Sequence, residues 1–110
     1  MGADTTTNPE ELIRMRRTEL EALCRRYAVR RLRLFGSAVS GAFDPQRSDL
    51  DFLVEFDAPV GMSRFDQFFG LREELAALLG RRVDLIDWKA ARNPYFRKQA
   101  EAEAVELYAA

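Results

Sequence analysis

The sequence predicts an α/β (α+β) domain in which a small mixed sheet of about three to four strands is flanked by helices. Three observations favour this class. Segments with helical apolar spacing alternate with short strand-like segments, turn residues separate them, and 47% of the 110 residues are hydrophobic. A chain of this length suits one compact domain. We expect residues 1–8 to form a flexible tail and residues 9–110 to form the domain.

The first helix is expected over residues 9–27. Asn8 can cap it, Pro9 suits the first helical position, and Glu11 can complete a capping box. Apolar side chains at helical spacing mark the face that would be buried: Ile13, Leu20, Cys24 and Tyr27. These signals predict a single amphipathic helix before the first strand.

Two strands follow in the predicted order. Residues 29–35 alternate leucine and arginine, as a strand would, and residues 38–48 predict a loop with room for one helical turn. Residues 49–56 give the clearest strand pattern in the chain. One face of this strand carries apolar side chains, namely Leu50, Phe52, Val54 and Phe56. The other face carries Asp49, Asp51, Leu53 and Glu55.

The second half of the chain predicts a helix, a strand and a closing helix. Apolar spacing marks a helix over residues 63–79, which Gly80 can end, and residues 82–87 predict a third short strand. Asn93 and Pro94 can start the last helix. The apolar residues expected to share a face of that helix are Phe96, Ala100, Ala104, Leu107 and Tyr108.

Composition excludes several kinds of site. The 17 basic and 18 acidic residues nearly balance, which does not support general nucleic-acid binding. Histidine is absent and Cys24 is the one cysteine, so histidine-based catalysis is excluded and a structural zinc site nearly so. A metal would need oxygen ligands, as magnesium, manganese and calcium do. No apolar run is long enough to span a membrane, and we expect a cytoplasmic protein.

A pair of carboxylates at the start of the second strand is the strongest chemical signal. Asp49 and Asp51 are two residues apart on a strand, so they project the same way with Cα atoms roughly 6.5–7 Å apart. Carboxylates so placed repel each other unless a cation lies near them. Phosphoryl transfer uses such pairs to hold two divalent ions. For an isolated Asp-x-Asp, an ordinary polar strand end is the stronger interpretation.

Two further features favour the chemical interpretation. Gly36 and Ser37 directly follow a strand, where backbone N–H groups and a hydroxyl can approach a phosphate, although such a pair alone is usually a turn. Asp84 lies inside an apolar run, where an acid is costly unless it has a role or a partner. If its strand lies beside residues 49–56, Asp84 can supply a third carboxylate. The alternative is an acid at a sheet edge that reaches solvent or an arginine.

The combination of these features resembles the DNA polymerase beta-like nucleotidyltransferase superfamily, and within it the minimal nucleotidyltransferase (MNT) domains. Three runs carry the resemblance: Leu34-Phe35-Gly36-Ser37, Ser48-Asp49-Leu50-Asp51-Phe52-Leu53-Val54 and Arg82-Val83-Asp84-Leu85-Ile86. The resemblance covers nearly the whole chain and includes residues 103–108, which look like the closing helix of these short proteins. It implies the polymerase beta-like nucleotidyltransferase fold.

The resemblance also implies roles for individual residues. The implied nucleotide-binding residues are Gly36, Ser37 and Ser48. Asp49 and Asp51 would hold two Mg²⁺ ions, for which Mn²⁺ could substitute. Asp84 would hold the catalytic ion and help deprotonate an acceptor hydroxyl that attacks the α-phosphate of ATP and releases pyrophosphate.

One departure from the family pattern affects phosphate binding. Family members often carry an arginine shortly after the Gly-Ser pair, and Ser40 stands at that place here. Arg47 could substitute for the missing arginine. The loop that leads to Asp49 is also one residue longer than the common spacing.

Stand-alone MNT proteins of this size resemble antitoxins that pair with HEPN-domain ribonuclease toxins. The resemblance implies that such an antitoxin adds AMP to its toxin and silences it, in a homo- or hetero-oligomer. Two alternatives remain open: an antitoxin that neutralises its partner by contact alone, and a dimeric nucleotidyltransferase that modifies a small molecule such as an aminoglycoside. The intact Asp49, Asp51 and Asp84 argue against the first alternative, and the short chain argues against the second.

Overall fold

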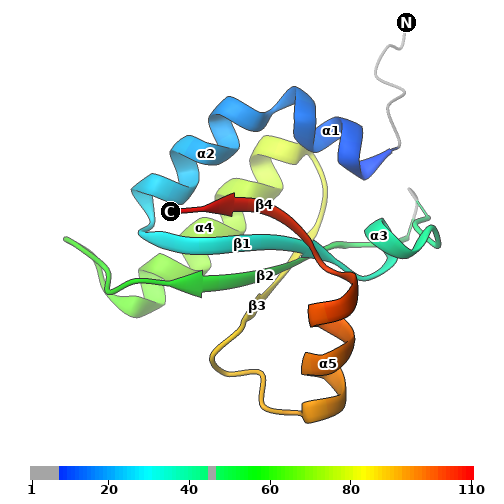
Figure 1. The fold of residues 1–110 in the computed structure, drawn as a ribbon. Helices are drawn as coiled ribbons and strands as arrows, with labels where there is room; N and C mark the ends of the chain where they lie inside the picture. The colour runs from blue at the N-terminus through cyan, green and yellow to red at the C-terminus, as the bar shows by residue number, and fades with distance from the viewer. Residues whose placement is uncertain (1–7, 45–46) are drawn as a thin grey trace, which may run out of the picture.

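The computed structural model describes residues 8–44 and 47–110, and within them it forms an α/β domain with a four-stranded mixed sheet (Figure 1). The strand order is β3-β2-β1-β4, with β1 antiparallel to both neighbours and β2 parallel to β3. In chain order the elements are α1 (Pro9–Met15), α2 (Arg17–Arg26), β1 (Val29–Phe35), α3 (Ser37–Ser40), β2 (Leu50–Phe56), α4 (Arg64–Leu79), β3 (Val83–Asp87), α5 (Pro94–Glu103) and β4 (Val105–Ala109). The predicted fold class is confirmed.

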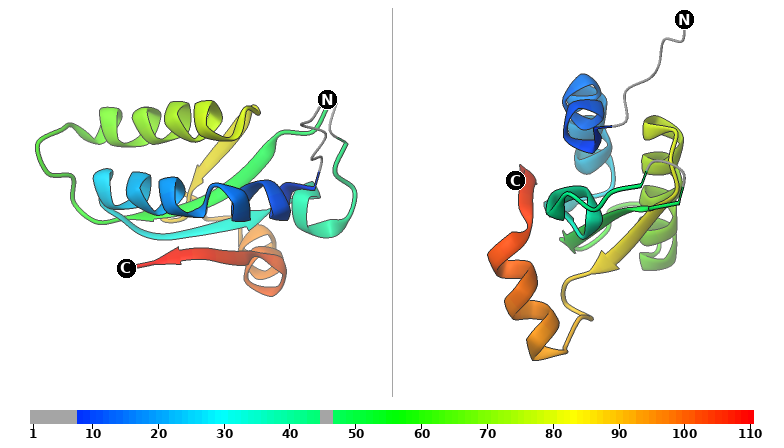
Figure 2. Two further views of the ribbon diagram at one scale, coloured as in Figure 1. Left: turned by 90° about the horizontal axis from the view of Figure 1, so that it is seen from above. Right: turned by 90° about the vertical axis from the view of Figure 1, so that its right-hand side faces the viewer.

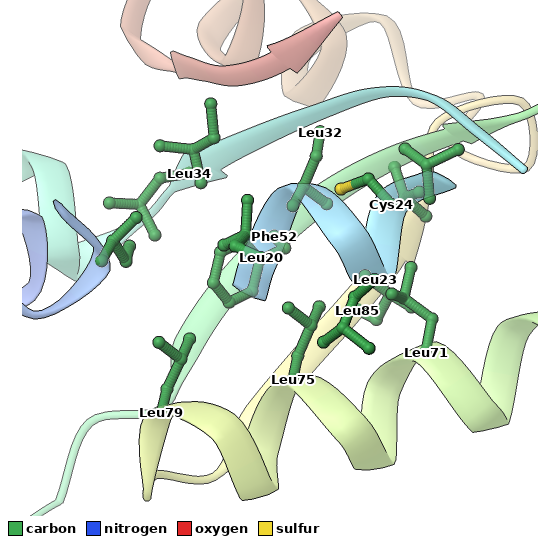
Figure 3. Close-up of a cluster of buried hydrophobic side chains, with 14 of the residues drawn as sticks. Leu20, Leu23, Cys24, Leu32, Leu34, Phe52, Leu71, Leu75, Leu79 and Leu85 are labelled. Carbon is green, nitrogen blue, oxygen red and sulfur yellow. The ribbon is translucent and has the colours of Figure 1, made fainter. Parts of the chain in front are cut away.

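Helices cover the two faces of the sheet unequally. Helices α1, α2 and α4 lie on one face, and α5 lies on the other (Figure 2). The main core lies between the sheet and the three helices, where leucines of α2 and α4 meet Leu32, Leu34 and Phe52 (Figure 3). A smaller core, formed by Leu53, Trp88 and Ala100, lies under α5. Because successive side chains of β2 point to opposite faces of the sheet, this strand contributes apolar side chains to both cores.

The first predicted helix is wrong in one respect, because the chain forms two helices instead of one. Asn8 caps α1 by accepting hydrogen bonds from two backbone N–H groups, as expected. The helix then breaks at Arg16, whose backbone N–H donates to Ile13 O at 3.0 Å, and the chain bends into α2 (Figure 1). Ile13 and Leu20, which lie on either side of the break, are both fully buried.

The predicted closing helix is also wrong beyond Glu103. Ala104 is extended, and Val105–Ala109 forms β4, which pairs with the outer edge of β1. Without β4, the peptide groups along that edge of β1 would lack partners. The spacing of Ala104, Leu107 and Tyr108 fits a helix, but in the strand Leu107 turns into the main core and is 7% exposed.

The remaining elements follow the predicted pattern. The strand over residues 29–35 has the expected bounds, the loop holds one helical turn (α3), and α4 begins after Ser63 and ends at Gly80. Cys24 is fully buried, and burial raises the pKa of its thiol to about 12. The described part of the chain contains no helix both long and apolar enough to cross a membrane. A flexible tail was expected over residues 1–8, and residues 1–7 of it lie outside the described residues.

Candidate functional site

The three predicted aspartates lie at one end of two neighbouring parallel strands. Asp51 is the second residue of β2, and Asp84 is its register partner on β3. Residues opposite each other in neighbouring strands project to the same face of a sheet. Leu53, two residues further along β2, packs in the smaller core under α5, so Asp51 and Asp84 face that side. Asp49 directly precedes β2 and lies two residues before Asp51, so the alternation of side chains along the strand directs it to the same side.

Electrostatic repulsion is present in this group of carboxylates. The pKa of Asp51 is raised, first by partial burial and then by the negative charges of Asp84 and Asp49. Asp51 is half-buried, whereas Asp84 is exposed. A carboxylate whose charge is disfavoured by burial and by two like charges gains from a neighbouring cation. The site therefore favours a bound positive charge.

Asp49 already has a positively charged neighbour. Its Oδ1 lies 2.9 Å from Nε of Arg82, and Nη2 of Arg82 also donates to the backbone carbonyl of Arg47 at 2.8 Å. That Oδ1 is buried, and no donor among the described residues makes a well-aligned hydrogen bond to it. The contact with Arg82 is thus an ion pair whose geometry leaves an acceptor poorly satisfied.

The donor set fits an oxygen-liganded divalent cation. In the described residues, no three acidic, histidine or cysteine side chains are already gathered closely enough to hold a metal ion. The carboxylates of Asp51 and Asp84 repel each other, and Asp49 is engaged by Arg82, so a cation would have to draw Asp49 towards the other two. Carboxylate oxygens are the ligands that magnesium and manganese prefer.

The Gly36 turn lies against the carboxylate of Asp51. Phe35, the last residue of β1, is the register partner of Asp51, so the chain turns beside the acidic group. Gly36 has a φ of 75°, and a Cβ at this position would lie 2.3 Å from Oδ2 of Asp51. Ser37 then begins α3, whose first turn is closed by hydrogen bonds from Val39 N and Ser40 N to Gly36 O. Only glycine allows so close an approach.

Ser48 holds the loop that leads to Asp49. Its hydroxyl accepts a hydrogen bond from the backbone N–H of Asp44 at 3.0 Å, and its own N–H donates to Asp44 O at 2.8 Å. This pair of hydrogen bonds fixes the chain just before the carboxylates. The structure thus gives Ser48 a role in positioning the loop, beside the nucleotide contact expected from the sequence.

Two arginines on this side of the sheet were not singled out by sequence reasoning. Arg82 directly precedes β3, and its side chain contacts Asp49. The position of Arg82 in the sequence does not predict this contact. Arg33 lies on β1, and although arginine is usually exposed, this side chain is 3% exposed. Its guanidinium lies 4.5 Å from the centre of the Trp88 ring, beside Glu101. The leucine–arginine alternation did place Arg33 opposite the main core.

Known proteins match most of this chain. A family model described as "Nucleotidyltransferase domain" matches residues 17–107. The "putative protein adenylyltransferase MJ1379" of Methanocaldococcus jannaschii is 39% identical over 80 residues, which cover 73% of this chain and 78% of the relative.

Solved structures share the fold. The structure of a "putative minimal nucleotidyltransferase" superposes with a TM-score of 0.72 at 34% identity and covers 94% of this chain and 98% of its own. A chain from the structure of a tri-AMPylated Shewanella oneidensis HEPN toxin in complex with MNT antitoxin has a TM-score of 0.61 at 20% identity. The match covers 88% of this chain and 72% of that chain, and at this identity the likeness concerns the fold alone.

Proposed function

The chain belongs to the nucleotidyltransferase domain family, and we propose that this nucleotidyltransferase transfers AMP from ATP to a hydroxyl group of a partner protein. The observation that carries the proposal is the placement of Asp51 opposite Asp84, with the Gly36 turn against Asp51. Carboxylates beside a glycine turn can bring divalent ions and a triphosphate to one place. We assign the domain to residues 9–110 and place the protein in the cytoplasm.

In this proposal Asp49, Asp51 and Asp84 hold two Mg²⁺ ions, or Mn²⁺ in their place. When bound, the ions neutralise charge on the phosphates and on the attacking oxygen. Nucleotide binding is assigned to the turn and the loop before β2, through Gly36, Ser37 and Ser48. The close approach of Gly36 to Asp51 supports the assignment of the turn, because it sets the turn beside a carboxylate that would hold a metal ion.

The transfer itself is a displacement at the α-phosphorus of ATP. The acceptor hydroxyl oxygen forms a bond to phosphorus, the bond to the β-phosphate oxygen breaks, and pyrophosphate leaves. The proton of the hydroxyl goes to the carboxylate of Asp84, whose exposure on β3 supports access by a bulky acceptor. Catalysis would rest mostly on positioning and charge neutralisation.

We assign the acceptor to a HEPN-type toxin, with this chain as its antitoxin. The relative that is 39% identical carries the name of a protein adenylyltransferase, which supports a protein as the acceptor. The fold is shared with a chain from an AMPylated HEPN toxin–MNT antitoxin complex. Assembly with that toxin in a hetero-oligomer would supply the acceptor hydroxyl.

Transfer of labelled AMP tests the proposal. The protein is incubated with α-labelled ATP, Mg²⁺ and the product of the adjacent gene, and label on that partner is expected. Asp51→Asn and Asp84→Asn should each reduce labelling by roughly 100-fold or more, since each removes charge that stabilises the transition state. Asp57→Asn is the matched control, because Asp57 forms an exposed ion pair with Arg30 beyond the other end of β2.

The outcomes separate the three hypotheses. Neutralisation of the partner by Asp51→Asn without any labelling would favour an antitoxin that acts by contact. Label that moves to an aminoglycoside and not to the partner would favour a small-molecule transferase. Label on the partner that is unchanged in both Asp51→Asn and Asp84→Asn would overturn the assigned site.

A further inference from the structure

Arg82 forms the one ion pair, among those in the described part of the chain, that includes Asp49, Asp51 or Asp84. We propose that Arg82 serves as the counter-ion of Asp49 until a divalent cation binds, and then contacts the phosphates of the nucleotide. This inference rests on the proposed function. It assigns a role to a residue outside the carboxylate group and the Gly36 turn.

Arg82 and a divalent cation would compete for the Asp49 carboxylate. Nε of Arg82 lies 2.9 Å from Oδ1 of Asp49, and this oxygen is buried. A divalent cation bound to the Asp49 carboxylate and a guanidinium at that distance would repel each other. The two positive groups therefore weaken each other's binding at Asp49, and binding of the cation favours release of Arg82.

The structure allows that movement at small cost. The side chain of Arg82 is 73% exposed, so it is not locked by packing. Apart from the ion pair, its guanidinium is held by one hydrogen bond, to the backbone carbonyl of Arg47 at 2.8 Å. Exposed ion pairs contribute little to stability, so the release of this one costs little.

After release the guanidinium must stay near the site. The backbone carbonyl of Arg82 accepts a hydrogen bond from Leu50 N at 2.9 Å, which fixes Arg82 between Asp49 and Asp51 at the start of β2. Arg82 also lies two residues before Asp84, and residues two apart in an extended segment project to the same side. A triphosphate bound at the carboxylates and the Gly36 turn would be the nearest anion, and a guanidinium can donate to two of its oxygens at once.

Opposite changes in two affinities test this inference. Mn²⁺ alone is titrated by electron paramagnetic resonance of the free ion, and a nonhydrolysable ATP analogue with Mg²⁺ is titrated by calorimetry. Arg82→Gln should bind Mn²⁺ about two- to fivefold more tightly than the unchanged protein, because the competing charge is gone. The same variant should bind the ATP analogue about tenfold more weakly, because a charge-assisted contact is lost.

Two further variants control the experiment. Arg81→Gln makes the same charge change one residue away, where the guanidinium packs over Phe43 at 5.4 Å, and it should leave both affinities within about twofold of the unchanged protein. Arg82→Lys keeps the charge and should retain more analogue affinity than Arg82→Gln. A merely structural role for Arg82 would weaken both affinities together.

The results distinguish failure of this inference from failure of the proposed function. If Arg82→Gln binds Mn²⁺ and the analogue as the unchanged protein does, or shifts both in one direction, Arg82 has no such role although the carboxylate site stands. If the unchanged protein and Asp51→Asn bind Mn²⁺ equally, the metal site itself is misassigned, and both proposals fall.

Discussion

The backbone of Gly36 lies directly against the carboxylate of Asp51, so that a Cβ at Gly36 would stand 2.3 Å from Asp51 Oδ2. The antiparallel pairing of β1 with β2 produces this contact, because Phe35 and Asp51 are register partners. A contact this short leaves no room for a side chain. The identity of residue 36 is therefore tied to the position of the carboxylate that it faces.

Gly36→Ala should reduce both stability and AMP transfer. Alanine at a φ of 75° is strained, and its Cβ would displace the Asp51 carboxylate, so we expect a loss of about 1–3 kcal/mol in unfolding free energy. Urea unfolding and labelled-AMP transfer measure the two effects. Gly41→Ala is the control, since Gly41 has a φ of 86° but nothing within 4 Å of an added Cβ. Equal behaviour of the two variants would show that the contact with Asp51 is unimportant.

Asp51→Asn should stabilise the protein in the absence of divalent ions at neutral pH. The pKa of Asp51 is raised in the folded state by burial and by two neighbouring aspartates, so the carboxyl favours folding only while it is protonated. That contribution is present below the unfolded-state pKa and is lost as the pH rises through the folded-state pKa. We expect a gain of up to about 1 kcal/mol at pH 7, the range of like-charge pairs across strands.

The pH dependence of this variant is the stricter test. The advantage of Asp51→Asn should shrink as the pH falls and Asp51 of the unchanged protein becomes protonated. Added Mn²⁺ should raise the melting temperature of the unchanged protein and have less effect on the variant. Asp57→Asn, which removes an exposed ion pair with Arg30, should show no such gain. A variant less stable than the unchanged protein at every pH would contradict the repulsion described above.

Local patterns predicted most of the fold, and they failed where distant contacts decide the outcome. The alternation in β1 and β2 and the end of α4 at Gly80 depend on near neighbours in the chain, and these elements were predicted well. The strand β4 was predicted as a helix because its apolar spacing fits either structure. The segment forms a strand because it pairs with the outer edge of β1. That edge is more than seventy residues away in the chain, so a local sequence pattern does not predict the pairing.

The same distinction applies to the candidate site. Asp49 and Asp51 were recognisable because two residues on one strand share a face, and Asp84 because an acid interrupts an apolar run. The contact of Asp49 with Arg82 was not predictable, since it depends on the register of β2 with β3. The burial of Arg33 depends likewise on the packing of α5 over the sheet.

Arg33→Ala should destabilise the protein far more than Arg30→Ala. The guanidinium of Arg33 is buried against Trp88 and lies 3.5 Å from Glu101, so its removal loses packing, a cation–π contact and counter-charge. We expect a loss of about 2–4 kcal/mol in unfolding free energy. Arg30 forms an exposed ion pair with Asp57, and its removal should cost below about 1 kcal/mol. Equal losses in chemical denaturation would show that the burial of Arg33 has no energetic weight.

Leu107→Ala should test the assignment of β4 as part of the core. Leu107 is 7% exposed and belongs to the main cluster, so truncation should cost about 2–4 kcal/mol in urea unfolding. Val105 lies on the same strand but is 38% exposed, and Val105→Ala should cost less than about 1 kcal/mol. Because β4 pairs with β1 near Leu34, residues on both strands should also show slow amide hydrogen exchange. Fast exchange over residues 105–109, together with equal costs for the two substitutions, would mean that this segment does not complete the sheet in solution.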